Sequence, residues 1–86
     1  MEIKREFVLR NIGGDILLVP TGKTALSLNG MITLNEVGAE IWKMLPEVSS
    51  EEEIVERILA EYDATAEEVR KDVSEFLEKF RELDII

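Results

Sequence analysis

Short apolar runs separated by turn residues fill the first part of the chain. Phe7–Ile12 and Asp15–Pro20 flank the pair Gly13-Gly14. Two such runs around two glycines predict a β-hairpin, because a two-residue hairpin turn requires positive φ angles, which glycine adopts without strain. Residues 20–23 predict a second turn, since Pro20 has no N–H to donate to a neighbouring strand.

Two further extended runs precede the helical part of the sequence. Residues 24–28 place Leu26 and Leu28 on one face of a strand. Asn29-Gly30 indicates a turn, and residues 31–34 form a last short extended run. These runs are either two strands or one bulged strand. With the hairpin, they predict a small antiparallel sheet within residues 1–34.

Apolar residues at helical spacing predict three helices in residues 35–86. The first begins at Asn35, which we interpret as an N-cap, and ends before Pro46. Its apolar residues Ile41 and Trp42 are expected in the core. The capping boxes expected at the start of the second and third helices are Ser49 with Glu52 or Ser50 with Glu53, and Thr65 with Glu68.

The third helix, expected to end near Leu83, carries a broad apolar stripe. A domain of this size needs most of that stripe for its core, so we interpret Val73, Leu77 and Phe80 as core residues first. Phe76 and Val69 lie toward one margin of the stripe and are the candidate walls of an exposed pocket. The stripe consists of Val69, Val73, Phe76, Leu77, Phe80 and Leu83.

These patterns predict an α+β fold in which a small N-terminal antiparallel sheet precedes three helices, a layout like that of winged-helix domains. The chain has 86 residues, which is enough for one compact core and too few for a large enclosed active site. We therefore expect a single domain over residues 1–86, with strands and turns in residues 1–34 and helices in residues 35–86.

The composition removes several kinds of catalytic chemistry. The sequence contains no cysteine and no histidine, which excludes disulfides, thiolate nucleophiles, Cys/His zinc sites and imidazole acid–base catalysis. It also lacks the glycine-rich nucleotide-binding motifs and the G-x-S-x-G nucleophile motif. We therefore expect a binding protein without catalytic residues, metal or cofactor.

The excess negative charge lies in the helical half. Nineteen acidic against ten basic residues give a net charge of −9, and residues 47–86 hold fourteen acids and five bases, so they account for all of it. This argues against binding to a nucleic-acid backbone. No apolar run approaches the roughly 18–20 residues that span a bilayer, and the N-terminus does not have a signal-peptide pattern. The default expectation is a cytoplasmic protein without membrane contact.

Binding to an extended peptide fits these elements better. A free edge strand can pair with a peptide through main-chain hydrogen bonds, while pockets against a neighbouring helix select its side chains. The same free edge could also pair with a second copy of the chain, so a monomer or a weak dimer is expected. Two alternatives stay open: a general protein–protein adaptor, and a winged-helix transcription regulator, which the charge disfavours.

Three segments, taken in order, resemble the PqqD-like family, the pyrroloquinoline quinone synthesis protein D group that contains the RiPP recognition elements. Residues 34–42 are similar to its L-N-E-x-[AG]-x-x-I-W box, and residues 54–63 to its I-x-x-x-L-x-x-x-Y-D helix. Residues 72–86 are similar to its D-V-x-x-F-L ending. Asp84 stands where the family has glycine, a position that aspartate tolerates because it can adopt a left-handed conformation. Residues 23–31 are longer than the corresponding family segment.

The resemblance implies a non-catalytic peptide chaperone. Family members bind the leader of a ribosomally synthesised precursor peptide and deliver it to a modifying enzyme, often a radical SAM protein. The leader adds to the strand that precedes the helices, which is residues 31–34 here, with residues 24–28 as the alternative. Asp72 could form a local ion pair or contact a basic leader residue. The implied peptide-binding residues are Met31, Ile32, Thr33, Leu34, Val69, Asp72, Val73, Phe76 and Phe80.

Overall fold

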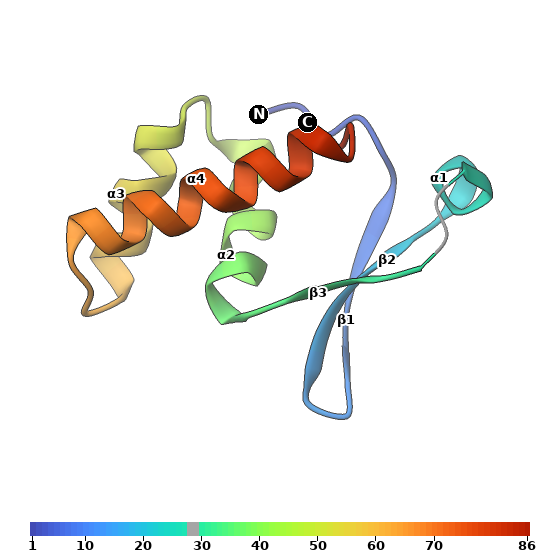
Figure 1. Ribbon diagram of the computed structural model, residues 1–86, viewed down its shortest axis with the longest axis horizontal. Coiled ribbons are helices and arrows are strands. Elements are labelled where there is room, and N and C mark those ends of the chain that lie inside the picture. Colours follow the sequence, from blue (N-terminus) through green and yellow to red (C-terminus); the bar gives the residue numbers. More distant parts are fainter. Residues whose placement is uncertain (28–29) are drawn as a thin grey trace.

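A three-stranded antiparallel sheet lies beside a group of helices in the computed structural model, which describes residues 1–27 and 30–86 (Figure 1). The α+β class is confirmed, as is the N-terminal antiparallel sheet ahead of three long helices, although a short helix interrupts the strands. The sheet has the spatial order β1-β2-β3. In chain order the elements are β1 (Phe7–Ile12), β2 (Asp15–Pro20), α1 (Gly22–Ser27), β3 (Ile32–Leu34), α2 (Glu36–Met44), the 3₁₀ helix η1 (Leu45–Glu47), α3 (Glu51–Glu61) and α4 (Ala66–Glu82).

The hairpin of β1 and β2 forms as predicted. Ile12 pairs with Asp15, so Gly13 and Gly14 alone make the turn. Their φ angles are +59° and +89°, which is the left-handed backbone that a two-residue turn of this kind requires. The register then runs without interruption to Phe7 opposite Pro20.

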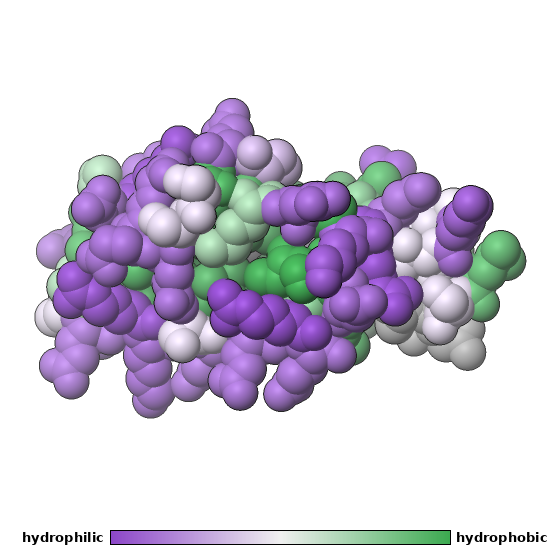
Figure 2. All heavy atoms as spheres, turned by 90° about the horizontal axis from the view of Figure 1, so that it is seen from above, coloured by the Kyte–Doolittle hydropathy of each residue, from purple (hydrophilic) through white to green (hydrophobic). Residues whose placement is uncertain are grey.

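The predicted strand over residues 24–28 is wrong, because the chain forms the short helix α1 there. Thr24 is buried, and its hydroxyl accepts a hydrogen bond from the backbone N–H of Glu6 at 2.8 Å. Leu26 is 88% exposed and does not belong to a sheet face. An isolated apolar group stands out at this end of the molecule in the space-filling view (Figure 2). Leu28, and Asn29 of the predicted Asn29-Gly30 turn, lie outside the described residues.

The last strand is shorter than predicted. β3 begins at Ile32, and Met31 lies before it with 58% of its surface exposed. Ile32 pairs with Leu18 and Leu34 pairs with Ile16, so among the strands of residues 1–27 and 30–86 β3 joins only β2. In the ribbon, β3 leads directly into α2, and α4 crosses α2 farther along that helix (Figure 1).

An aromatic chain links the sheet to the helices. Phe7 of β1 and Trp42 of α2 have ring centroids 5.9 Å apart, and Trp42 lies 5.9 Å from Phe80 of α4, both in edge-to-face geometry. Phe76 lies 6.2 Å from Phe80. The predicted core positions are confirmed, with Trp42 partly buried against the cluster. The buried cluster comprises Leu18, Leu34, Ile41, Leu45, Val48, Ile54, Val55, Ile58, Val69, Val73, Leu77, Phe80 and Ile85.

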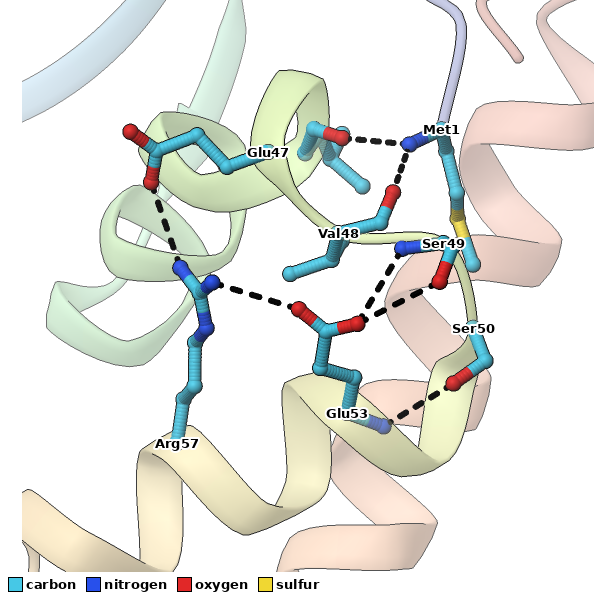
Figure 3. Close-up of polar contacts among 8 residues, drawn as sticks. Met1, Glu47, Val48, Ser49, Ser50, Glu53 and Arg57 are labelled. Carbon is cyan, nitrogen blue, oxygen red and sulfur yellow. Dashed lines mark hydrogen bonds and ion pairs between the residues drawn. The ribbon is translucent and has the colours of Figure 1, made fainter.

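Side-chain caps begin the three long helices where the sequence predicts them. Asn35 Oδ1 accepts the Gly38 N–H at 2.7 Å, and Thr65 Oγ1 accepts the Glu68 N–H at 3.2 Å. Of the two candidate boxes for α3, the one that forms uses Ser50 as N-cap. Its hydroxyl accepts the Glu53 N–H at 3.2 Å, while the Glu53 carboxylate accepts from the N–H and hydroxyl of Ser49 (Figure 3).

Polar contacts also hold the two ends of the chain against the helices. The Met1 ammonium donates to the backbone carbonyls of Leu45 and Val48 (Figure 3). The Lys4 N–H donates to the Ile85 carbonyl at 2.6 Å, in the segment that follows α4. Asp84, in that segment, has a φ of +57°. The sequence-based expectation that aspartate accepts a left-handed conformation here is therefore confirmed.

We expect Asn35→Ala to lower the free energy of unfolding by about 1 kcal/mol, within a range of about 0.5–2 kcal/mol, because it removes the cap of α2. Chemical denaturation monitored by circular dichroism measures this loss. Asn35→Ser is the matched control, since serine retains a capping oxygen and should recover most of the stability. Equal losses for alanine and serine would contradict the assignment of Asn35 as a cap.

Candidate peptide-binding site

A groove with a volume of about 320 Å³ lies between β3 and α4. β3 forms one margin of the sheet, and within the described residues no strand pairs with its outer edge. The backbone N–H and C=O groups along such an edge are available to an additional strand. The groove is lined by Thr33, Asn35, Asp72, Glu75, Phe76 and Lys79.

The half-buried ring of Phe76 supplies the apolar surface of the groove. It packs on the backbone of α2 at Gly38, where an added Cβ would lie 2.5 Å from the Phe76 Cζ. Real Cβ atoms do not approach a ring this closely, so any side chain larger than that of glycine at this position would force the Phe76 ring to shift. The missing side chain at Gly38 therefore determines how deeply the ring sits.

Charged side chains of α4 stand on both sides of this ring. Asp72 and Glu75 lie on the N-terminal side of Phe76 and Lys79 lies on its C-terminal side, all of them exposed. Within residues 1–27 and 30–86 none of the three takes part in an ion pair. The carboxylates of the neighbouring α3, by contrast, are partly neutralised: Arg70 contacts Glu52 at 3.0 Å and Arg57 contacts Glu53 at 3.2 Å.

The structure brings only some of the sequence-predicted residues to the groove. Thr33 of the strand Ile32–Leu34 meets Asp72 and Phe76 of α4 there. Leu34, Val73 and Phe80 are buried in the core. Val69 is only 4% exposed, so its prediction as an exposed pocket wall is wrong; it packs into the core cluster in the first turn of α4.

Sequence reasoning missed Glu75 and Lys79 as lining residues and treated Asn35 only as a cap. Asn35 does cap α2, and it also lines the groove. Residues three and four positions apart share one helix face, so the spacing from Asp72 and Phe76 to Glu75 and Lys79 was a usable signal.

Raised pKa values occur at two side chains outside the groove. Burial raises the pKa of the Tyr62 phenol, and the carboxylates of Glu36, Glu40 and Glu61 raise it further, so this group is neutral at physiological pH. The hydrogen bond that the Arg70 guanidinium donates to the Glu52 carboxylate raises the pKa of Arg70. These shifts describe a neutral phenol and a surface ion pair, neither of which supplies a proton-transfer group to the groove.

The described part of the chain has neither a metal-binding cluster nor a membrane-spanning helix. No group of three or more His, Cys, Asp or Glu side chains there could hold a metal ion. None of its helices has the length and apolarity that crossing a bilayer demands.

Comparison of the sequence and the fold with those of known proteins identifies the family of this chain. The family described as coenzyme PQQ synthesis protein D (PqqD) matches residues 6–86. The chain belongs to the PqqD family. Its fold is also similar to that of a solved structure described as TbiB1 in complex with the TbiA(beta) leader peptide, with a TM-score of 0.71 and 28% sequence identity. That similarity covers 99% of this PqqD-family chain and 93% of TbiB1. No curated protein matches the sequence significantly.

Proposed function

We propose that this PqqD-family protein binds the leader segment of a ribosomally synthesised precursor peptide as an added strand in the groove between β3 and α4. The observation that carries the proposal is the edge of β3 beside the Phe76 groove, with which no strand of the described residues pairs. The similar fold of TbiB1, whose structure is described as holding a leader peptide, supports it. Residues 1–86 would act as one recognition domain.

Strand addition divides the recognition between backbone and side chains. Main-chain hydrogen bonds to β3 would give affinity that depends little on the peptide sequence, while the ring of Phe76 would select an apolar side chain. Ordering a flexible leader costs several kcal/mol, so we expect dissociation constants on the order of micromolar to high nanomolar.

The chemical modification itself would belong to a partner enzyme. With neither cysteine nor histidine, this chain lacks the side chains most used for nucleophilic and acid–base catalysis, and we propose that it only presents the leader. Following the family resemblance, the proposed partner is a radical SAM enzyme.

A displayed library of random peptides of about ten residues, long enough to pass β3 and its flanks, tests the site. Selected peptides are titrated into isotope-labelled protein, and amide shifts are expected at Ile32–Leu34 and along the Phe76 face of α4. The peptide mass should be unchanged after incubation with the protein alone. Shifts confined to α3 would instead favour a general adaptor, and a mass change would contradict the non-catalytic role.

We expect Phe76→Ala to weaken binding of a selected peptide about tenfold or more, equivalent to about 1.4 kcal/mol, because it removes the apolar surface of the groove. Isothermal titration calorimetry measures the affinity. Tyr62→Ala is the matched control: it also removes a half-buried aromatic ring, but from a position outside the groove. Equal losses of affinity for the two variants would contradict the assignment.

A further inference from the structure

The α4 wall of the groove carries an uneven set of charges. Asp72 and Glu75 contribute two negative charges and Lys79 one positive charge, so the groove has a net charge of −1. Glu75 and Lys79 are four positions apart, a spacing at which the two side chains can pair in solution. Such a pair would neutralise Glu75 and leave Asp72 as the carboxylate without a partner among the described residues.

Asp72 lies at a distance from Phe76 that an extended peptide can match. The two residues are four positions apart on α4, which corresponds to about 6 Å along the helix axis. In a β-strand, side chains on the same face are two positions and about 6.6 Å apart. A peptide side chain two positions from the one that contacts Phe76 would therefore reach Asp72.

We propose that the groove selects leader peptides with lysine or arginine two positions from the apolar residue that packs on Phe76. This inference rests on the function proposed above and specifies its substrate. A cationic side chain at that position would be attracted by Asp72, whereas an acidic one would be repelled by it.

The peptide library described above provides the first test. Peptides selected on the wild-type protein are expected to carry Lys or Arg two positions from an aliphatic or aromatic residue. Selection on Asp72→Lys, which reverses the charge of an exposed side chain, should enrich Asp or Glu at the same position. The same charge preference in both selections would overturn the inference.

Synthetic peptides give the quantitative test. A selected peptide with Lys at this position should bind Asp72→Asn about three- to tenfold more weakly than wild type, as expected for one lost exposed charge pair. Its Lys→Gln derivative should bind both proteins equally. Glu78→Gln is the matched control, because Glu78 is an exposed acid of α4 that does not line the groove; it should leave both affinities within about twofold.

The outcomes separate this inference from the proposed function. Peptides that shift the amides of Ile32–Leu34 but bind wild type and Asp72→Asn equally would overturn the charge selection and leave strand addition intact. A library that yields no peptide, or only peptides that shift residues elsewhere, would overturn both. Thermal unfolding of each variant, monitored by circular dichroism, checks that the fold is retained.

Discussion

Phe80→Ala should lower the free energy of unfolding by about 3–5 kcal/mol, the range for removing a buried phenylalanine ring. Phe80 is fully buried, and its ring contacts Trp42 and Phe76, so it joins α4 to α2. Domains are stable by about 0.05–0.15 kcal/mol per residue, or about 4–13 kcal/mol for a chain of 86 residues. The substitution would therefore remove a large part of the total stability.

Urea unfolding monitored by tryptophan fluorescence measures this loss, since Trp42 is the single tryptophan and its ring lies 5.9 Å from that of Phe80. Phe76→Ala is the comparison, because it removes the same atoms from a half-buried position of the same helix. We expect a clearly smaller loss there. Equal losses at the two positions would contradict the division between a core ring and a groove ring.

The elements that the sequence predicts correctly are those with a local chemical signal. The hairpin depends on the positive φ angles of Gly13 and Gly14. Glycine adopts such angles without support from residues elsewhere in the chain. The helix starts depend on Asn35, Ser50 and Thr65, each of which caps an N–H three positions along the chain. Such signals act over a few residues and can be read directly from the sequence.

The sequence-based predictions are wrong where contacts with distant residues determine the local structure or the burial of a side chain. A six-residue segment such as Gly22–Ser27 is too short for helical and strand periodicity to be told apart, and its conformation is supported by the bond between Thr24 and Glu6. Val69 lies at the margin of the α4 stripe, and a stripe alone does not tell which of its margins another element will cover. The likeness to winged-helix domains stays a prediction.

The candidate site was predictable in its location and not in its details. The expected edge strand and Phe76 do meet in the groove. The contact between Phe76 and Gly38 joins positions 38 residues apart, and neither residue alone signals it. The charges of the groove follow from the same contact, because the position of Phe76 determines which neighbouring residues of α4 line it.

Gly38→Ala provides the sharpest check of that contact. Alanine is favoured over glycine inside a helix by about 1 kcal/mol, but its Cβ would lie 2.5 Å from the Phe76 Cζ and 3.3 Å from the Asn35 Oδ1. Forcing an extra methyl group into a packed site costs about 1–3 kcal/mol. We expect a net loss of up to about 2 kcal/mol, and weaker peptide binding because the displaced ring enters the groove.

The same substitution in a Phe76→Ala background should change sign. Without the ring, the new methyl group meets only the Asn35 oxygen at 3.3 Å, so the helical preference for alanine should dominate and raise stability by up to about 1 kcal/mol. The double-mutant cycle, measured by urea unfolding, should give a coupling energy between the two positions of about 1–3 kcal/mol. A Gly38→Ala effect that is the same in both backgrounds would show that Phe76 does not rest on Gly38. The depth of the groove would then need another cause.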